Sequence, residues 1–96
     1  MLNSKQRAKL RSLAQNIDAI TQVGKLGVND ALIDGLDLAI EKRELIKITI
    51  LENSGLDIRE AGEEIADRLN AELVCVCGRK AIFYRRSNKN INHIEF

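Results

Sequence analysis

The 96-residue chain contains no proline and no tryptophan, and its aromatic residues are two phenylalanines and one tyrosine. Without proline, the ends of helices have to be set by capping side chains and by glycine. So few aromatic rings argue against a sheet that binds nucleic acid by stacking bases on its surface. No apolar run approaches the roughly 20 residues of a membrane-spanning helix, and basic residues interrupt the N-terminal segment where a signal peptide needs an apolar core. We therefore expect a cytoplasmic protein.

Groups that could carry catalysis or hold a metal are equally scarce. The single histidine, His93, lies in a polar C-terminal segment, and the two cysteines, Cys75 and Cys77, lie two positions apart in an apolar run. On a strand both thiols would point to the same face, and we interpret them as reduced, largely buried residues of a reducing compartment. A metal site needs more ligands than these, and no nucleophile has a clear histidine partner. We expect no enzymatic activity, no catalytic residue, no metal and no cofactor.

Charge is separated along the chain although the formal net charge is only +1. The first 16 residues carry four basic residues and no acid, and residues 79–90 carry five basic residues and no acid, whereas the middle is strongly acidic. On a helix, Lys5 and Lys9 would flank the apolar stripe on one side, and Arg7 and Arg11 would flank it on the other. Binding to a polyanion depends on the local patch more than on the total, so nucleic acid remains open as a partner.

Hydrophobic periodicity predicts three helices and four strands in the order α-β-α-β-α-β-β. The expected helices cover about residues 4–16, 30–42 and 58–70. The expected strands cover residues 19–23, 45–51, 72–77 and 80–85. Asn29 and Asp57 precede the second and third helices and are typical N-caps. The dipeptide Gly78-Arg79 predicts a two-residue hairpin of the glycine-first type between the last two strands.

Helical crossovers make the first three strands parallel and the hairpin makes the fourth antiparallel, so we expect an α/β fold with a four-stranded mixed sheet. The carboxyl ends of parallel strands share one edge, where ligands bind in open α/β sheets. Gly24-Lys25-Leu26-Gly27 and Gly78-Arg79-Lys80 should both lie at this edge. If the first helix packs back against the first strand, its N-terminal turns point there too. Five basic residues would then converge, namely Lys5, Lys9, Lys25, Arg79 and Lys80.

The loop Gly24-Lys25-Leu26-Gly27 has further properties that suit a phosphate. Glycine permits positive φ and lets another backbone approach closely. The helix that follows, with Asn29 as its cap, directs free N–H groups and the positive end of its dipole toward the loop. A GxxG loop clamps nucleic-acid backbone in one RNA-binding module, but four-residue loops with two glycines are also common as tight connectors. The loop lacks the Lys-Ser/Thr ending of a P-loop and the third glycine of a dinucleotide-binding turn.

Four segments, in their order and spacing, resemble the CRM domain family and in particular its stand-alone bacterial YhbY-type members. These segments are residues 2–7 (LNSKQR), 22–28 (QVGKLGV), 43–48 (RELIKI) and the Gly78-Arg79 hairpin followed by residues 83–86 (FYRR). The resemblance implies an RNA-binding domain whose fold is similar to the C-terminal domain of a bacterial translation initiation factor. In the family, the GxxG loop and nearby basic residues are taken as the RNA-contacting surface. Leu26 departs from the family pattern, which has a small or polar residue there.

Bacterial stand-alone members of this family are associated with precursors of the large ribosomal subunit. The resemblance therefore implies a non-catalytic RNA-binding protein of ribosome assembly, with precursor ribosomal RNA or a pre-large-subunit particle as its partner. The expected RNA-contacting residues are Gly24, Lys25, Leu26, Gly27, Lys5, Lys9, Arg79 and Lys80.

The third helix supports an alternative function. Its outer surface is acidic, and it is composed of Glu60, Glu63, Glu64 and Asp67. Such a surface is most simply a solvated face, but it would also suit an adaptor that recruits another protein. We expect a single domain over residues 1–96, with a core at about 2–87 and a polar tail at 88–96. It should be a monomer or weak dimer that binds no membrane.

Overall fold

The computed structural model of this chain describes residues 2–88, 93 and 94, so residues 89–92, 95 and 96 of the expected tail lie outside the described residues. The helices are α1 (Ser4–Ala14), α2 (Asp30–Arg43), α3 (Ile58–Leu69) and a short 3₁₀ helix, η1 (Glu52–Ser54). The strands are β1 (Gln22–Val23), β2 (Leu45–Ile50), β3 (Glu72–Cys77) and β4 (Lys80–Tyr84). The expected order of elements is confirmed, and the predicted helices and strands are each within a few residues of these bounds.

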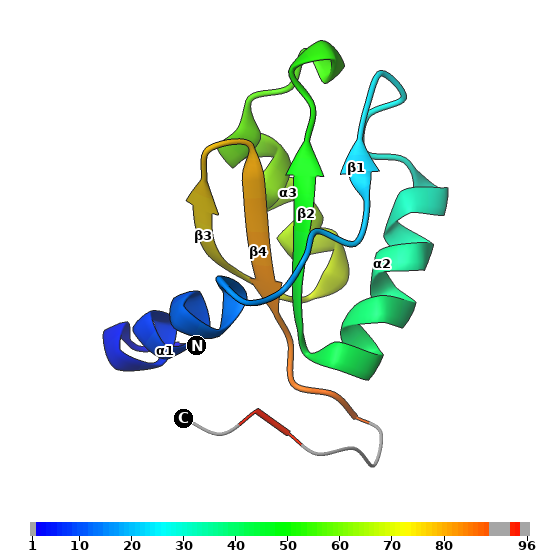
Figure 1. Cartoon of the computed structure of the whole chain (residues 1–96). Helices are drawn as coiled ribbons and strands as arrows, with labels where there is room; N and C mark the ends of the chain where they lie inside the picture. The colour runs from blue at the N-terminus through cyan, green and yellow to red at the C-terminus, as the bar shows by residue number, and fades with distance from the viewer. Residues whose placement is uncertain (1, 89–92, 95–96) are drawn as a thin grey trace.

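The strands form one sheet in the order β1-β2-β4-β3 (Figure 1). β1 pairs in parallel with β2, and β4 is antiparallel to both of its neighbours, β2 and β3. The first three strands therefore run in one direction, as expected, and β4 lies between β2 and β3. The regular strand β1 is shorter than the predicted strand. The segment before it still pairs with β2, because the backbone N–H of Ile20 donates to the carbonyl of Lys47 at 2.9 Å. The pairing along β2 thus begins before β1 does.

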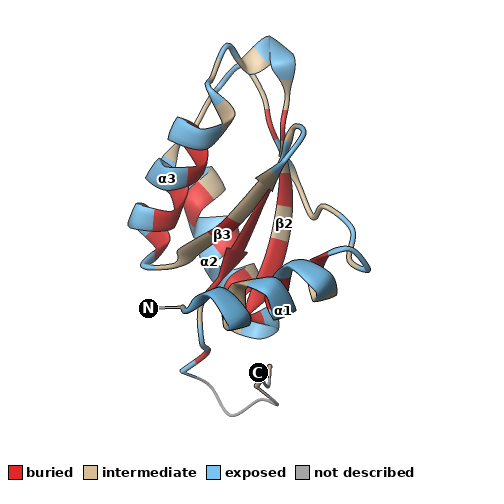
Figure 2. Cartoon of the chain, turned by 90° about the vertical axis from the view of Figure 1, so that its left-hand side faces the viewer, coloured by how far each residue is buried: buried red, intermediate tan, exposed pale blue. Residues whose placement is uncertain are grey.

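The two faces of the sheet are covered to different extents. α2 and α3 cover one face, and β2 directs Ile46, Ile48 and Ile50 into that layer, where all three are fully buried. α1 covers the other face only at the end where β2 begins and β4 ends (Figure 1 and Figure 2). Leu10 and Ala14 of α1 are buried there. Their buried neighbours in this cluster are Leu45, Val74, Ile82 and Tyr84.

Side-chain caps start all three α-helices, as a chain without proline requires. The side chain of Asn29 accepts from the N–H of Leu32 at 2.8 Å, and that of Asp57 accepts from the N–H of Glu60 at 2.9 Å. Both predicted caps are therefore confirmed. The start of α1 has the full reciprocal capping box, between Asn3 and Gln6, which the sequence reading did not identify. No helix among the described residues is long and apolar enough to span a bilayer.

The cysteine pair does not have the predicted burial. A β-bulge shifts the register of β3 between Leu73 and Cys75, and it leaves Val74 buried under α1 and Cys75 half-buried beside it. Burial raises the pKa of the Cys75 thiol. Cys77 lies opposite Lys80 and is exposed, so the expectation that both thiols are largely buried is wrong for Cys77. The reason is that α1 ends its coverage of this face before it reaches Cys77.

Candidate nucleic-acid interface

The GxxG loop joins β1 to α2 through a tight turn. The N–H of Gly27 donates to the carbonyl of Gly24 at 2.9 Å, and Gly27 has a φ of 67°. Gly24 has no positive φ, and a methyl group built on it would lie 3.9 Å from Cδ1 of Leu51, an ordinary contact. Only Gly27 therefore needs the left-handed region, whereas Gly24 is free for close approach by another backbone. Lys25 is exposed, and Leu26 is 87% exposed at the tip.

The first turn of α2 offers less to an anion than the sequence suggested. The side chain of Asn29 already accepts from the N–H of Leu32, and the next residue, Asp30, carries a negative charge. The carboxylate of Asp30 forms an ion pair with Arg68 of α3, which places the charge of that arginine beside the same turn. The groups of this loop that have no internal role and could contact a phosphate are therefore mainly Lys25 and the exposed backbone.

The hairpin between β3 and β4 is the predicted two-residue turn, with Cys77 opposite Lys80 and a φ of 61° at Gly78. Arg79 does not extend into solvent as an exposed basic residue would. Its Nε donates to the carbonyl of Ile50 at 2.8 Å and its Nη2 donates to the carbonyl of Leu51 at 2.9 Å. Arg79 is therefore half-buried and fastens the hairpin to the end of β2. Its side chain is a structural tether as well as a charge.

The two loops lie at the same edge of the sheet, as expected from the strand directions. Val23 is opposite Ile50, and Thr49 is opposite Lys80, so the ends of β1 and β2 and the start of β4 are level with one another. Two strand spacings separate β1 from β4, a distance of about 10 Å. Figure 1 shows both loops at the upper end of the sheet, together with η1, which adds the exposed acid Glu52. Lys25, Arg79 and Lys80 are thus brought to one edge.

The expected convergence of Lys5 and Lys9 on this edge is wrong, because α1 lies at the opposite end of the sheet (Figure 1). Arg7 fixes the helix there. Its guanidinium donates to the carbonyl of Leu73 at 2.8 Å and pairs with Glu72 at 2.9 Å, and both residues lie at the start of β3. The apolar stripe of α1 packs on side chains at this end of the sheet, and periodicity alone could not show which strands it would cover.

The sequence reading also missed two polar residues that lie beside the loops. Gln22 and Thr49 are opposite each other on β1 and β2, on the face that α1 leaves uncovered. They help to line a shallow polar hollow of about 490 Å³ with residues 19–21. The alternation of β2 indicated that Thr49 faces away from Ile48 and Ile50, but the pairing with Gln22 depends on a register that no local signal gives.

No group of three or more histidine, cysteine, aspartate or glutamate side chains in the described part of the chain is arranged to hold a metal ion. Besides the acid Glu52, the edge presents cations, an amide group and exposed backbone, and these groups contact phosphate and sugar in nucleic-acid complexes.

Comparison with known proteins agrees with this chemistry. The chain is 39% identical over 90 residues to the probable RNA-binding protein YqeI of Bacillus subtilis, and the alignment covers 94% of each chain. It is 25% identical over 96 residues to the probable RNA-binding protein PA4753 of Pseudomonas aeruginosa, covering 97% of this chain and 92% of that protein. The solution structure of the hypothetical protein SAV1595 from Staphylococcus aureus, described as a candidate RNA-binding protein, matches with a TM-score of 0.76, 39% identity and 95% coverage of both chains.

The family model for the CRS1 / YhbY (CRM) domain matches residues 2–85, which include every helix and strand of the fold. The chain therefore belongs to the CRS1 / YhbY (CRM) domain family.

Proposed function

We propose that this protein is a non-catalytic RNA-binding protein that holds the sugar–phosphate backbone of RNA at the edge formed by the GxxG loop and the β3–β4 hairpin. The observation that carries the proposal is the exposure of two lysines at this edge and their lack of internal contacts. Lys25 and Lys80 are exposed, and neither has a hydrogen-bond or ion-pair partner among the described residues. Both charges are therefore available to phosphate without breaking an internal contact.

Gly24 adds close backbone approach to this pair of charges. Aromatic rings are absent from the loops, which favours backbone contacts over base stacking. Both curated relatives are named as probable RNA-binding proteins, which supports the same partner for this chain.

We further propose that the RNA belongs to precursors of the large ribosomal subunit and that the protein acts in the cytoplasm during ribosome assembly. The support is the resemblance of the four sequence segments to stand-alone YhbY-type proteins. The experiment is crosslinking in cells followed by sequencing of the attached RNA. Enrichment of precursor sequences of the large-subunit RNA is expected, and a spread over unrelated transcripts would contradict the ribosomal assignment while leaving RNA binding intact.

The interface itself is tested by the double substitution Gly24→Asp with Lys25→Ala, which removes one cation and adds one anion at the loop. Gly24 tolerates a side chain in the fold, so the variant should remain folded. We expect much weaker binding to single-stranded RNA, and the salt slope should decrease by about 0.7 for the lost phosphate contact of Lys25. Gly35→Asp with Lys42→Ala makes the same charge change on exposed positions of α2 and serves as the matched control.

Equal binding by the loop variant and the control would show that the loop is not the interface. The alternative adaptor function predicts a different result for the wild type. A protein partner on the acidic surface of α3, where Glu60, Glu63, Glu64 and Asp67 are all exposed, would bind with a much smaller salt slope than RNA does.

A further inference from the structure

The edge formed by the GxxG loop and the β3–β4 hairpin is called the loop edge below. The half of the sheet face that α1 leaves open is continuous with it. Above α1, this face consists of Gln22, Thr49, Lys80 and Cys77, one from each strand. Thr49 is half-buried and the other three are exposed. Gln22 is followed by Val23 and then by the GxxG loop, and Lys80 directly follows the two-residue turn of the hairpin. A strand of RNA held at the loops would therefore reach this surface without a gap.

The charged side chains at strand positions of this open half are the lysines Lys47 and Lys80, whereas the acids Asp18 and Glu52 lie in the flanking connections. Lys47 lies on the same side of β2 as Thr49, and its ammonium group donates to the carbonyl of Ile17 at 3.0 Å. No acidic residue occupies a strand position of the uncovered half. The nearest acid along β3, Glu72, already pairs with Arg7.

Arg11 marks the far boundary of this face. It lies one helical turn after Arg7, which contacts β3, so both arginines lie on the flank of α1 that is turned toward β3. Burial raises the pKa of the Cys75 thiol, and the positive charges of Arg11, Lys47 and Arg7 oppose that rise, so all three charges act on this part of β3. Arg11 is exposed and has no hydrogen-bond or ion-pair partner among the described residues. Lys9 is on the opposite flank of the helix.

We propose that RNA bound at the loop edge continues across the open sheet face, over Lys80 and Thr49, and ends against Arg11. This inference rests on the proposed RNA-binding function and adds a second contact surface to it. Charge complementarity identifies the occupant as a nucleic-acid backbone, because the face offers cations, a hydroxyl and an amide but no aromatic ring on which a base could stack. The hollow beside Thr49 and Gln22 would take a phosphate or a ribose hydroxyl.

The first test compares two single substitutions on one helix, Arg11→Gln and Lys9→Gln. The probe is a single-stranded RNA of about 16 nucleotides, the upper end of the usual site size. Arg11→Gln should reduce the salt slope by about 0.7 and weaken binding about fivefold at 0.1 M salt, the contribution of one phosphate contact. Lys9→Gln removes the same charge from the other flank and should leave the slope unchanged. Equal slopes for wild type and Arg11→Gln would overturn the proposal.

The second test uses Cys77 as a native reporter, because its exposed thiol lies opposite Lys80 on the same face. Labelling with the neutral reagent N-ethylmaleimide should slow in proportion to the fraction of protein bound to RNA. The matched control carries Cys75→Ser, Cys77→Ser and Glu63→Cys, which moves the thiol to the outer surface of α3, and RNA should not change its labelling. Full-rate labelling of Cys77 in saturated complex would also overturn the proposal.

These outcomes separate the inference from the function on which it rests. If Gly24→Asp with Lys25→Ala abolishes binding while Arg11→Gln and Cys77 labelling show no effect, the loop edge binds RNA and the open face does not. If wild-type protein does not bind the RNA probe at all, both proposals are wrong. A reduced slope for Arg11→Gln together with protection of Cys77 supports the extended surface.

Discussion

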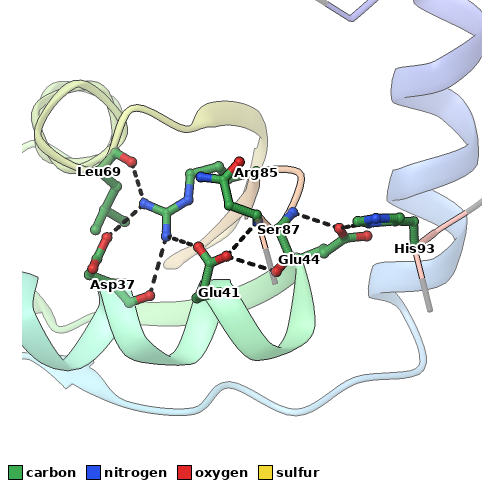
Figure 3. A network of polar contacts seen from close by, with 8 residues as sticks. Asp37, Glu41, Glu44, Leu69, Arg85, Ser87 and His93 are labelled. Carbon is green, nitrogen blue, oxygen red and sulfur yellow. Dashed lines mark hydrogen bonds and ion pairs between the residues drawn. The ribbon is translucent and has the colours of Figure 1, made fainter. Parts of the chain in front are cut away.

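The two ends of the sheet use charged residues in opposite ways. At the end where β2 begins, the carboxylate of Glu44 is 1% exposed, accepts from the N–H of Ser87 at 2.6 Å and contacts His93 (Figure 3). It also accepts from the N–H of Ile94 at 2.8 Å. At the loop edge, Lys25 and Lys80 have no such partners among the described residues. Charges at the first end are used to hold the chain together, and charges at the second remain available to a ligand.

Arg85 is a second charged residue at the Glu44 end that is used for internal contacts. Its guanidinium donates to Asp37 at 2.7 Å, to the carbonyl of Leu69 at 2.7 Å and to Glu41 at 3.0 Å, and so joins α2 to the end of α3 (Figure 3). Both Arg85 and Lys80 count as basic residues of the same C-terminal stretch. Of these two residues, Lys80 alone can contribute to binding without a loss of internal contacts. The number of basic residues in a stretch therefore does not measure its affinity for RNA.

Glu44 is held in a backbone conformation that glycine usually occupies. It ends α2 with a φ of 64°, and its N–H donates to the carbonyl of Ile40 at 2.8 Å. Burial raises the pKa of its carboxyl, but hydrogen bonds from Ser87, His93 and Ile94 outweigh burial and leave that pKa below its ordinary value. The pKa of Glu41 is also lowered, first by the hydroxyl of Ser87 and then by the N–H of Asn88.

Removing the Glu44 carboxylate should have the largest effect in the molecule. Glu44→Ala leaves the N–H groups of Ser87 and Ile94 without their acceptor in a buried site, and we expect the free energy of unfolding to fall by about 2–4 kcal/mol. RNA affinity, measured on the folded fraction, should stay the same because Glu44 and its partners Ser87, His93 and Ile94 are not among the residues proposed to contact RNA. Urea unfolding and a binding titration test the two parts. A loss of less than about 1 kcal/mol would break the comparison between the two ends.

The matched variant Glu44→Gln keeps an acceptor oxygen and removes the charge, so it isolates the dependence on pH. A carboxyl whose pKa is lower in the folded state contributes stability above its ordinary pKa and loses it as pH falls through the folded pKa. The wild type should therefore lose stability from about pH 5 downward, with Glu41 adding a contribution of the same sign. The unfolding free energy of Glu44→Gln should fall less steeply between neutral and acid pH than that of the wild type, as measured by denaturant titrations at several pH values. The same dependence on pH in both proteins would contradict this assignment.

Arg79 is the exception that sharpens the comparison, because it is a charge of the loop edge that serves the fold. Arg79→Ala removes two bonds to the carbonyls of Ile50 and Leu51 at a half-buried position, and we expect a loss of about 1–2 kcal/mol. Lys80→Ala, next to it, removes an exposed charge without a partner in the described part of the chain and should leave stability nearly unchanged. Thermal or urea unfolding of both variants tests the difference. Equal stability of the two would mean that the tether contributes nothing.

Local signals in the sequence predicted local structure well. Asn29 and Asp57 cap helices as expected, and Gly78 forms the expected turn, because each depends only on residues within one turn of the chain. The direction of the strands followed from the lengths of their connections, and it placed the GxxG loop and the hairpin at one edge correctly.

What the sequence could not give depends on contacts between distant residues. The placement of β4 between β2 and β3, the position of α1 and the tether of Arg79 all require knowledge of which elements pack together. Glu44 is the clearest case. In the sequence it is one acidic residue between a helix and a strand, and its burial depends on Ser87 and Ile94, more than 40 positions away. No periodicity or motif reports such a contact.

The smallest expected effect concerns the two glycines of the loop, which the structure separates by role. Gly27 has a φ of 67°, so Gly27→Ala should cost about 1 kcal/mol of stability through strain. Gly24 has no positive φ and a methyl group there meets only Leu51 at 3.9 Å, so Gly24→Ala should leave the unfolding free energy unchanged or slightly raised.

If RNA backbone approaches Gly24 closely, that same methyl group should weaken RNA binding although the fold is intact. Gly35→Ala on α2, where a methyl group meets nothing, is the control for a glycine far from the loops. Urea unfolding measures the stability of the three variants, and titration with single-stranded RNA measures their affinity. Wild-type affinity in Gly24→Ala would show that phosphate contacts at this edge come from Lys25 and Lys80 alone. Weaker binding without loss of stability would identify Gly24 as a residue that serves binding, whereas Gly27 serves the turn.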